Sequence, residues 1–321
     1  MRLPTSAIGS FPKPEYLRDA RRQFGRGEIR ADELRRLEEQ ATRDCIRLQD
    51  EIGLDVLVDG EMYRGDMTTF FAQHLEGFGI SGLVRSYGNR YYRKPILRGP
   101  VRRPRPMTVD WWRFAQSLTR KPMKAILTGP YTMMDWSFDE HFESREAATM
   151  ALAAVIHDEL VDLEAAGAKV IQIDEPAISV RTDELPLAIA AMRVVTKGIH
   201  ARTIAHVCYG DLAAIYPKML ELAVDQFALE LSNSDYDMLE PFKRAPFTKE
   251  IGFGVLDVHS HRVESAEEVK ERLRRALEVF PSDKIWVNPD CGLKTRTEAE
   301  ARGKLEAMIQ ATRAVREEIG A

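Results

Sequence analysis

The sequence predicts an α/β protein built as a (β/α)8 barrel of the TIM type. Eight short apolar or β-branched runs, each bounded by Gly, Asp, Asn or Pro, have the composition of buried strands. Amphipathic helical patterns fill most of the intervals between them, and 321 residues are enough for one barrel with insertions. We therefore expect one domain over residues 1–321. A doubly wound open sheet is the main competitor, although no Gly-x-Gly-x-x-Gly follows a strand.

The predicted strands and helices alternate along the chain. The strands are expected at residues 5–9, 54–58, 123–127, 169–173, 203–207, 226–229, 251–256 and 284–287. The helices are expected at residues 34–52, 107–118, 145–166, 184–197, 212–222, 266–279 and 298–319. The first helix has an apolar stripe that includes Cys45, and Ser265 with Glu268 forms a capping box before residue 266. This alternation favours parallel strand pairing.

One stretch interrupts the alternation. Residues 86–99 (SYGNRYYRKPILRG) predict a β-hairpin that turns at Gly88 and Asn89, and the prolines of the PVRRPRP that follows oppose regular structure. We expect an insertion over about residues 78–106, between the second and third barrel strands. Such an excursion would lie over one end of the barrel and either cover the site or remain a solvated basic loop.

Composition narrows the class of function. Hydrophobic residues make up 44% and charged residues 30%, as in ordinary globular proteins, and the net charge of −4 gives no sign of nucleic-acid binding. Three cysteines are too few for a disulfide scaffold and fit a reducing cytoplasm. The N-terminus has no signal pattern, and no apolar run approaches the ~18 residues of a membrane span. We therefore expect a cytoplasmic protein with neither nucleic acid nor membrane as a partner.

Titratable side chains gather where the predicted strands end, which is where barrel enzymes carry their chemistry. His206 and Cys208 project to the same side of their strand because side chains alternate. An imidazole, a carboxylate and two thiolates would complete a tetrahedral Zn²⁺ site. The four candidate ligands are His206, Cys208, Glu230 and Cys291. The competing interpretation is a buried histidine beside core thiols.

The charge of this ligand set indicates what a zinc ion would do there. Two thiolates and a carboxylate lower the Lewis acidity of the ion, which favours holding an incoming thiol as a thiolate over activating water. A closed structural zinc site is the alternative. His259 is a candidate for proton transfer, against the simpler role of an ordinary hydrogen-bonded histidine. Glu61 and Asp174 could bind an ammonium group, against a role in helix capping.

Eight motifs over nearly the whole chain give a specific resemblance. They are IGSFP (8–12), VLVDGEMYRGDM (56–67), TGPYTMMDWSF (128–138), IQIDEPA (171–177), HVCYGD (206–211), ELSNSD (230–235), GVLDVHS (254–260) and VNPDCGLKTR (287–296). In these motifs the chain resembles the catalytic domain of cobalamin-independent methionine synthase, which has a (β/α)8 barrel. The resemblance implies a zinc-dependent transfer of a methyl group to the thiol of homocysteine.

The resemblance also implies roles for particular residues. It assigns Zn²⁺ to the four candidate ligands named above and proton handling during departure of the methyl donor to His259. The amino-acid part of homocysteine would meet Ile8, Gly9 and Ser10 through its carboxylate, and Glu61 and Asp174 through its ammonium group. The methyl donor would contact Arg90, Tyr91 and Trp136.

Two departures from the family pattern bear on the methyl donor. The chain starts at the catalytic domain, without the N-terminal half of the longer members, and Val180 stands where those members carry an acidic residue at the pterin site. We therefore expect a methyl-corrinoid (methylcobalamin, free or protein-bound) more than 5-methyltetrahydrofolate. The basic residues 98–105 would contact an acidic donor protein or stay solvated.

Other functions remain open from the sequence. One is a different zinc thiol alkyltransferase of the same barrel, acting on coenzyme M or another thiol. Another is a zinc-binding barrel without catalysis. A barrel like that of uroporphyrinogen decarboxylase would need no metal at all.

Overall fold

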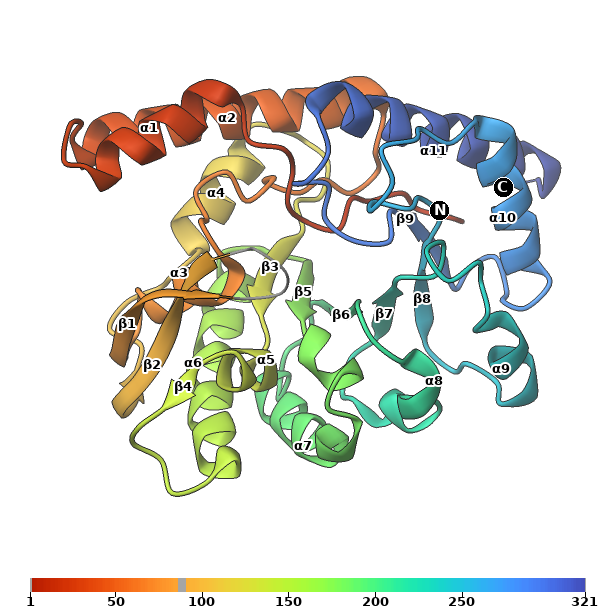
Figure 1. Cartoon of the computed structure of the whole chain (residues 1–321). Coiled ribbons are helices and arrows are strands. Elements are labelled where there is room, and N and C mark those ends of the chain that lie inside the picture. Colours follow the sequence, from red (N-terminus) through yellow and green to blue (C-terminus); the bar gives the residue numbers. More distant parts are fainter. Residues whose placement is uncertain (1, 86–90, 321) are drawn as a thin grey trace. The chain divides into compact units, whose positions relative to one another are not determined.

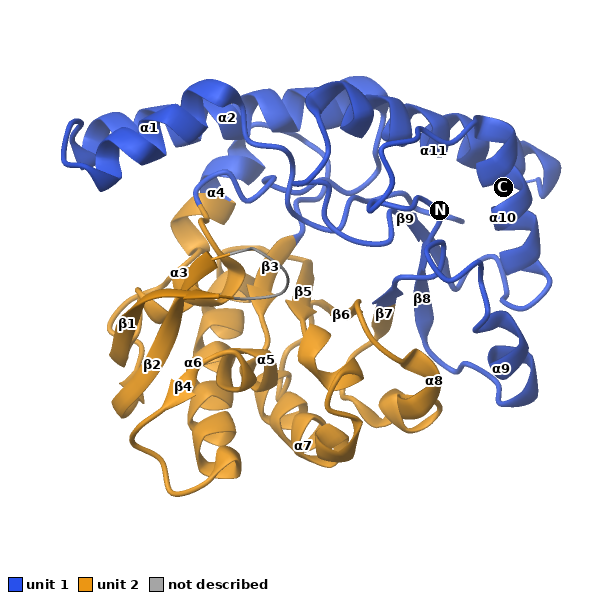
Figure 2. Ribbon diagram, viewed as in Figure 1, with its two compact units in different colours: residues 1–63, 113–124, 228–321 blue, residues 64–112, 125–227 orange. Residues whose placement is uncertain are grey.

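The computed structural model describes residues 2–85 and 91–320 (Figure 1). The chain divides into two compact units (Figure 2). Unit 1 comprises Met1–Tyr63, Arg113–Lys124 and Ala228–Ala321, and unit 2 comprises Arg64–Trp112 and Ala125–Phe227. The expectation of a single domain over residues 1–321 stays a prediction.

Unit 2 contains three parallel strands whose side chains are nearly all buried. They are β3 (Ala125–Thr128), β5 (Val170–Asp174) and β6 (Arg202–Val207). The register places Thr128 beside Asp174, and Asp174 beside His206. The helices of this unit are α3 (Met67–Ala72), α5 (Pro130–Asp135), α6 (Arg145–Ala165), α7 (Leu185–Val195) and α8 (Leu212–Ile215), with short 3-10 turns η1 (Pro176–Ser179), η2 (Thr182–Glu184) and η3 (Lys218–Glu221).

The predicted hairpin is present in unit 2. Strands β1 (Glu76–Arg85) and β2 (Tyr91–Arg102) pair antiparallel, and the turn expected at Gly88 and Asn89 lies outside the described residues. The expectation of irregular backbone over residues 100–106 is wrong for the first three of them, because β2 continues to Arg102, and it is confirmed for residues 103–106. The short β4 (Phe138–Asp139) pairs with β2 only at Ile96 and Leu97. Within the described part of the chain, the rest of that edge of β2 has no strand beside it. Pro95 and Pro100, which lack a backbone N–H, therefore cost no hydrogen bond there.

Unit 1 contains β8 (Glu250–Gly254) and β9 (Ile285–Asn288), which pair in parallel. The predicted strands at 5–9 and 54–58 are reduced to single bridges, Thr5 with Val287, Ser6 with Val56 and Leu57 with Met123. The helices are α1 (Glu15–Gly25), α2 (Ala31–Ile52), α9 (Leu239–Arg244), α10 (Ala266–Leu277) and α11 (Glu298–Glu318).

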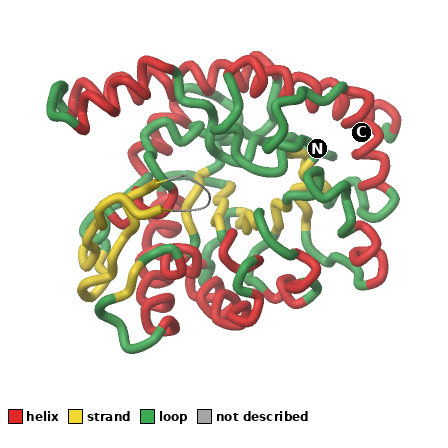
Figure 3. The backbone as a smooth tube through the Cα atoms, in the orientation of Figure 1, coloured by secondary structure: helices red, strands yellow, loops and turns green. Residues whose placement is uncertain are grey.

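The larger sheet has the strand order of a (β/α)8 fold. Hydrogen bonding follows the order β3-β5-β6-β7-β8-β9, where β7 is Gln226–Leu229. The parallel bridges at Thr5, Ser6 and Leu57 add the first and second predicted strands to this order. All eight strand predictions thus have a counterpart, and Figure 3 lets the reader follow the alternation of strands and helices. The predicted fold class is confirmed.

The helix predictions are confirmed with one exception. The helix expected at 212–222 is interrupted, because α8 ends at Ile215 and the 3-10 turn η3 begins at Lys218. Pro217 lies between them, and its ring and missing N–H prevent a continuous helix. The helix expected at 107–118 is α4 (Val109–Ser117), and α1, α3, α5 and α9 had no predicted counterpart. Among the residues that the structure describes, no helix has the length and apolar composition that crossing a bilayer requires.

Candidate metal and substrate site

His206 and Cys208 lie at the exit of β6 in unit 2, and both are buried. The chain turns directly after them through the left-handed residues Tyr209 (φ 53°) and Gly210 (φ 129°). Ser179 supports this turn, because its Oγ lies 3.2 Å from the backbone oxygen of Cys208 and 2.5 Å from that of Tyr209. A Cβ at Gly210 would lie 2.7 Å from the backbone oxygen of Ser179, so glycine is required there. Sequence reasoning missed Ser179.

Glu230 and His259 form a hydrogen-bonded pair in unit 1. The Nε2 of His259 donates to Oε1 of Glu230 over 2.7 Å, and the Glu230 side chain is 8% exposed while that of His259 is 33% exposed. This hydrogen bond raises the pKa of His259 above its usual value. The imidazole is therefore partly open to solvent on one side and held by a carboxylate on the other.

Asp290 organises the backbone beside two predicted ligands. Its buried carboxylate accepts the backbone N–H groups of Leu231, Ser232 and Asn233 over 2.8–3.1 Å. These are the residues that directly follow Glu230, and Asp290 itself directly precedes Cys291. Burial raises the pKa of Asp290 to about 7. No sequence signal identified Asp290, because its partners follow another strand.

Three predicted ligands form a group that could hold a metal ion. The ligand atoms of His206, Cys208 and Cys291 all lie within 4.8 Å of one another. No cysteine of the described chain forms a disulfide. One imidazole and two thiols are donors that Zn²⁺ prefers, so the residues fit this metal. Glu230, the fourth predicted ligand, is not a member of this group, and its carboxylate is hydrogen-bonded to His259.

Unit 1 also places Ser10 beside the segments of Cys291 and Glu61. The backbone oxygen of Ser10 accepts the N–H of Leu293 over 2.7 Å, and a Cβ at Gly292 would lie 2.2 Å from the Ser10 hydroxyl. The N–H of Phe11 donates to Gly60, and Glu61 follows with a left-handed φ of 54°. Of the other residues predicted for the substrate carboxylate, Ile8 and Gly9 are buried beside Ser10 in the chain.

Asp174 is the last residue of β5 in unit 2 and Glu175 follows it, but their side chains have different surroundings. Asp174 lies beside His206 in the sheet and accepts a hydrogen bond of 2.7 Å from Gln172. Glu175 is fully buried and accepts the N–H groups of Tyr131 and Thr132 and the Thr132 hydroxyl. It thus holds the start of α5, and burial raises its pKa to about 7. Although Glu175 directly precedes η1, its side chain makes no capping hydrogen bond to that turn.

The residues predicted for the methyl donor are only partly described. Arg90 lies outside the described residues. Tyr91 begins β2 with 60% of its surface exposed, and half-buried Trp136 directly follows α5. Val180 follows η1 and is exposed.

The basic residues 98–105 are not simply a solvated loop. Arg98 pairs with Glu140 at 3.1 Å on the surface. The Arg103 side chain is 8% exposed and pairs with Glu159, which is fully buried, at 3.2 Å. At least these two arginines are therefore engaged within the chain itself.

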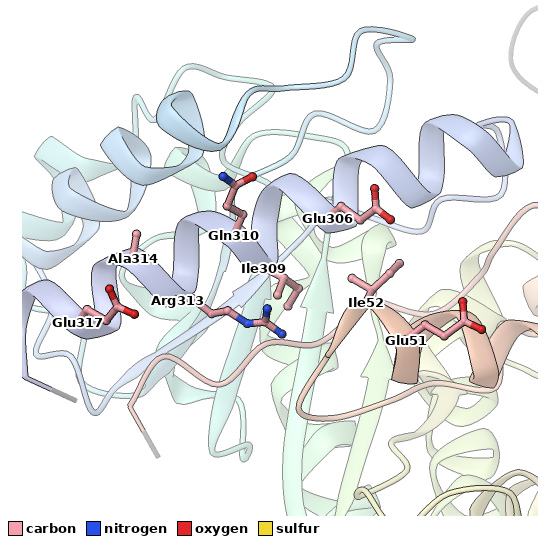
Figure 4. Close-up of a pocket in the computed structure, with 8 residues that line it drawn as sticks. All are labelled: Glu51, Ile52, Glu306, Ile309, Gln310, Arg313, Ala314 and Glu317. Carbon is pink, nitrogen blue, oxygen red and sulfur yellow. The ribbon is translucent and has the colours of Figure 1, made fainter.

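Figure 4 shows a hollow of about 400 Å³. It is formed within unit 1 by the end of α2 and one side of α11, and it contains no predicted site residue. Its lining consists of Glu51, Ile52, Glu306, Ile309, Gln310, Arg313, Ala314 and Glu317.

Comparisons with known proteins agree with the resemblance in the motifs. Residues 3–314 match the family model described as "Cobalamin-independent synthase, Catalytic domain". A methionine synthase from Saccharolobus solfataricus is 39% identical over 99% of this chain and 96% of its own length. A 5-methyltetrahydropteroyltriglutamate–homocysteine methyltransferase from Xylella fastidiosa is 42% identical over 98% of this chain, which spans only 43% of that longer protein.

A solved structure extends this agreement to the fold. The B12-independent methionine synthase from Shewanella sp. W3-18-1, in complex with selenomethionine, superposes with a TM-score of 0.89 at 30% identity. The similarity covers 99% of both chains. Together with the family model, it shows that this chain belongs to the cobalamin-independent synthase catalytic-domain family.

Proposed function

We propose that this protein is a methionine synthase that transfers a methyl group to the sulfur of homocysteine. The observation that carries the proposal is the group of His206, Cys208 and Cys291, a thiol-rich donor set within a chain of this family. The names of the relatives from Saccharolobus and Xylella support the same activity.

The proposed metal is Zn²⁺, held by His206, Cys208 and Cys291 with Glu230 as a fourth ligand. Support comes from the donor chemistry, and neither cysteine is engaged in a disulfide. When bound, the ion would keep the homocysteine sulfur as a thiolate at neutral pH, where a free thiol is mostly protonated. Asp290 would keep the Glu230 segment in place through three backbone hydrogen bonds.

The remaining residues would bind and orient the substrate. Glu61 and Asp174 carry the negative charges that an ammonium group requires, and Ser10 offers a hydroxyl for the carboxylate. Fixing both ends of the amino acid holds its sulfur in one place, which accelerates an in-line displacement by removing rotational freedom. His259 would deliver a proton to the donor's leaving atom, since its imidazole is partly exposed and held in one orientation by Glu230.

The proposed methyl donor is a 5-methyltetrahydropteroyl folate. The comparisons do not support the expected corrinoid, because the family description and the Shewanella structure are cobalamin- or B12-independent and the Xylella relative is named for the folate. Arg90, Tyr91 and Trp136 are the proposed donor contacts. Val180 cannot hydrogen-bond a pterin and is exposed, so water would meet the pterin edge on that side.

Methionine formation tests the proposal most directly. Purified protein with measured zinc content would receive homocysteine and either 5-methyltetrahydropteroyltriglutamate or methylcobalamin. We expect turnover with the folate and loss of turnover after chelation, with recovery on adding Zn²⁺. Turnover with methylcobalamin alone would contradict the donor assignment, and a fully zinc-loaded protein inactive with both donors would contradict the function. Competition with coenzyme M would reveal a different thiol substrate.

A further inference from the structure

A buried ammonium group holds the loop that carries His259. The Lys304 side chain, on α11, is fully buried, and its Nζ donates to the backbone oxygens of Asp257 (2.9 Å) and Arg262. Its third acceptor is Oε2 of Glu264 at 2.8 Å, and the Glu264 side chain is 1% exposed. Three donors therefore meet three acceptors, and the two backbone oxygens lie on either side of His259 in the sequence.

Glu264 connects this ion pair to the histidine itself. Its Oε1 accepts the N–H of Asp257 over 2.9 Å. The Asp257 carboxylate in turn accepts the N–H of His259 over 2.8 Å. The imidazole of His259 then reaches Glu230, as described above. A continuous series of hydrogen bonds thus connects Lys304 on α11 to the proposed metal ligand Glu230.

This loop depends on side chains for its position. Residues 257–264 belong to no helix or strand, and the backbone hydrogen bonds that join Val255 to Asn288 and Leu256 to Asp290 end just before them. Burying a charge pair is costly, and an apolar pair of similar size would stabilise a protein as well or better. The pair is therefore better explained by what it positions than by the stability it adds.

We propose that Lys304, acting with Glu264, is a positioning residue that fixes the His259 loop so that the imidazole meets Glu230. The inference rests on the proposed function, in which His259 handles a proton. Lys304 does not itself contact substrate in this proposal, and its effect passes through His259. The loss of Lys304 should therefore matter only while His259 is present.

The double variant Lys304→Met/Glu264→Gln tests this without leaving one charge buried alone. Methionine keeps the length of the side chain, and glutamine keeps an oxygen for the N–H of Asp257. We expect kcat to fall about 10-fold or more while KM for homocysteine stays within about 2-fold. In a His259→Asn background the same changes should cause no further loss. Arg302→Ala is the control, because Arg302 lies on the same helix and forms an exposed ion pair with Glu51 at 2.9 Å.

A loss of equal size in both backgrounds would overturn the proposal, as would unchanged kcat in the double variant. Amide hydrogen exchange of the metal-free protein gives a readout independent of turnover. We expect Val258 and His259 to exchange about 10-fold faster in the double variant and at the wild-type rate in Arg302→Ala. If the wild type transfers no methyl group, the proposed function fails, and exchange still decides the positioning role. If the double variant does not fold, Asp257→Ala, which removes the acceptor of the His259 N–H and leaves the buried ion pair intact, undergoes the same measurements.

Discussion

At the ends of β5 and β9, a predicted site residue and a buried carboxylate are neighbours in the sequence, but they come in opposite order. At β5, Asp174 is the predicted site residue, and the next residue, Glu175, turns into the protein. At β9, Asp290 turns inward first, and the next residue, Cys291, is the predicted ligand. Both inward carboxylates accept three hydrogen bonds, and burial raises the pKa of each to about 7. Neighbouring residues at a strand end thus have separable roles.

The two inward carboxylates differ in what they hold. Glu175 binds the start of α5, whereas Asp290 binds the backbone that directly follows Glu230. Removal of Asp290 should therefore disturb a proposed metal ligand, and removal of Glu175 should affect stability alone. Similar burial and a similar pKa therefore do not imply a similar role, because the role depends on the segment that supplies the donors.

The largest effect should come from the thiol at the β9 exit. Cys291→Ser removes one of the clustered donor atoms, so we expect zinc affinity to fall by more than about 100-fold and turnover to disappear. Metal analysis after dialysis, alongside methionine formation, would check this. Cys45→Ser is the matched control, because Cys45 is buried on α2 outside the group. A Cys291→Ser protein that keeps its zinc and its rate would show that the site is wrongly assigned.

Asp174→Asn should affect the substrate and leave the metal in place. Removing the charge proposed to meet the ammonium group of homocysteine should raise KM by on the order of 100-fold. Zinc content should equal that of the wild type, in contrast to the β9 variant. Steady-state kinetics and metal analysis of the same preparation would test this. An unchanged KM would remove Asp174 from the substrate site.

Asp290→Asn compared with Glu175→Gln probes the difference between the two exits directly. Each change leaves buried N–H groups poorly paired, which should cost about 1–3 kcal/mol of unfolding free energy. Only Asp290→Asn should also weaken zinc binding, by about 10- to 100-fold, because only that carboxylate holds the segment of Glu230. Chelator competition and denaturant unfolding would separate the two effects. Equal zinc affinities in both variants would show that the two carboxylates do not differ in role.

The smallest effect concerns pH and stability at the β5 exit. Since burial raises the folded-state pKa of Glu175 to about 7, the folded protein retains a proton that the unfolded chain has already released. The contribution of Glu175 to stability should be greatest below its ordinary pKa, decline as pH rises to about 7, and stay constant above that. Glu175→Gln should reduce this decline, measured by unfolding at pH 5 and pH 7. An identical decline in both proteins would show that Glu175 is ionised throughout.

The fold and the side chains at the strand ends could be predicted from the sequence, whereas the residues that support those side chains could not. An apolar run predicts a buried strand from neighbouring residues alone. The alternation of side chains along a strand was enough to place His206 and Cys208 on the same side. Ser179, Asp290 and Lys304 were missed, because each acts on backbone groups from a distant part of the chain. The break at Pro217 was readable from the sequence, but the apolar spacing around it favoured one continuous helix.

The bridge between Thr5 and Val287 joins two segments that are synthesised far apart in time. The N–H of Ser6 donates to Val287, the N–H of Val287 donates to Pro4, and Arg316 binds the backbone oxygen of Leu3. Val287 and Arg316 are synthesised about 280 residues or more after the segment of residues 3–6. During synthesis, residues 3–6 therefore keep unpaired backbone groups on one edge until the segments of Val287 and Arg316 have emerged from the ribosome. Premature termination before residue 285 would leave that edge permanently uncovered and prone to aggregation.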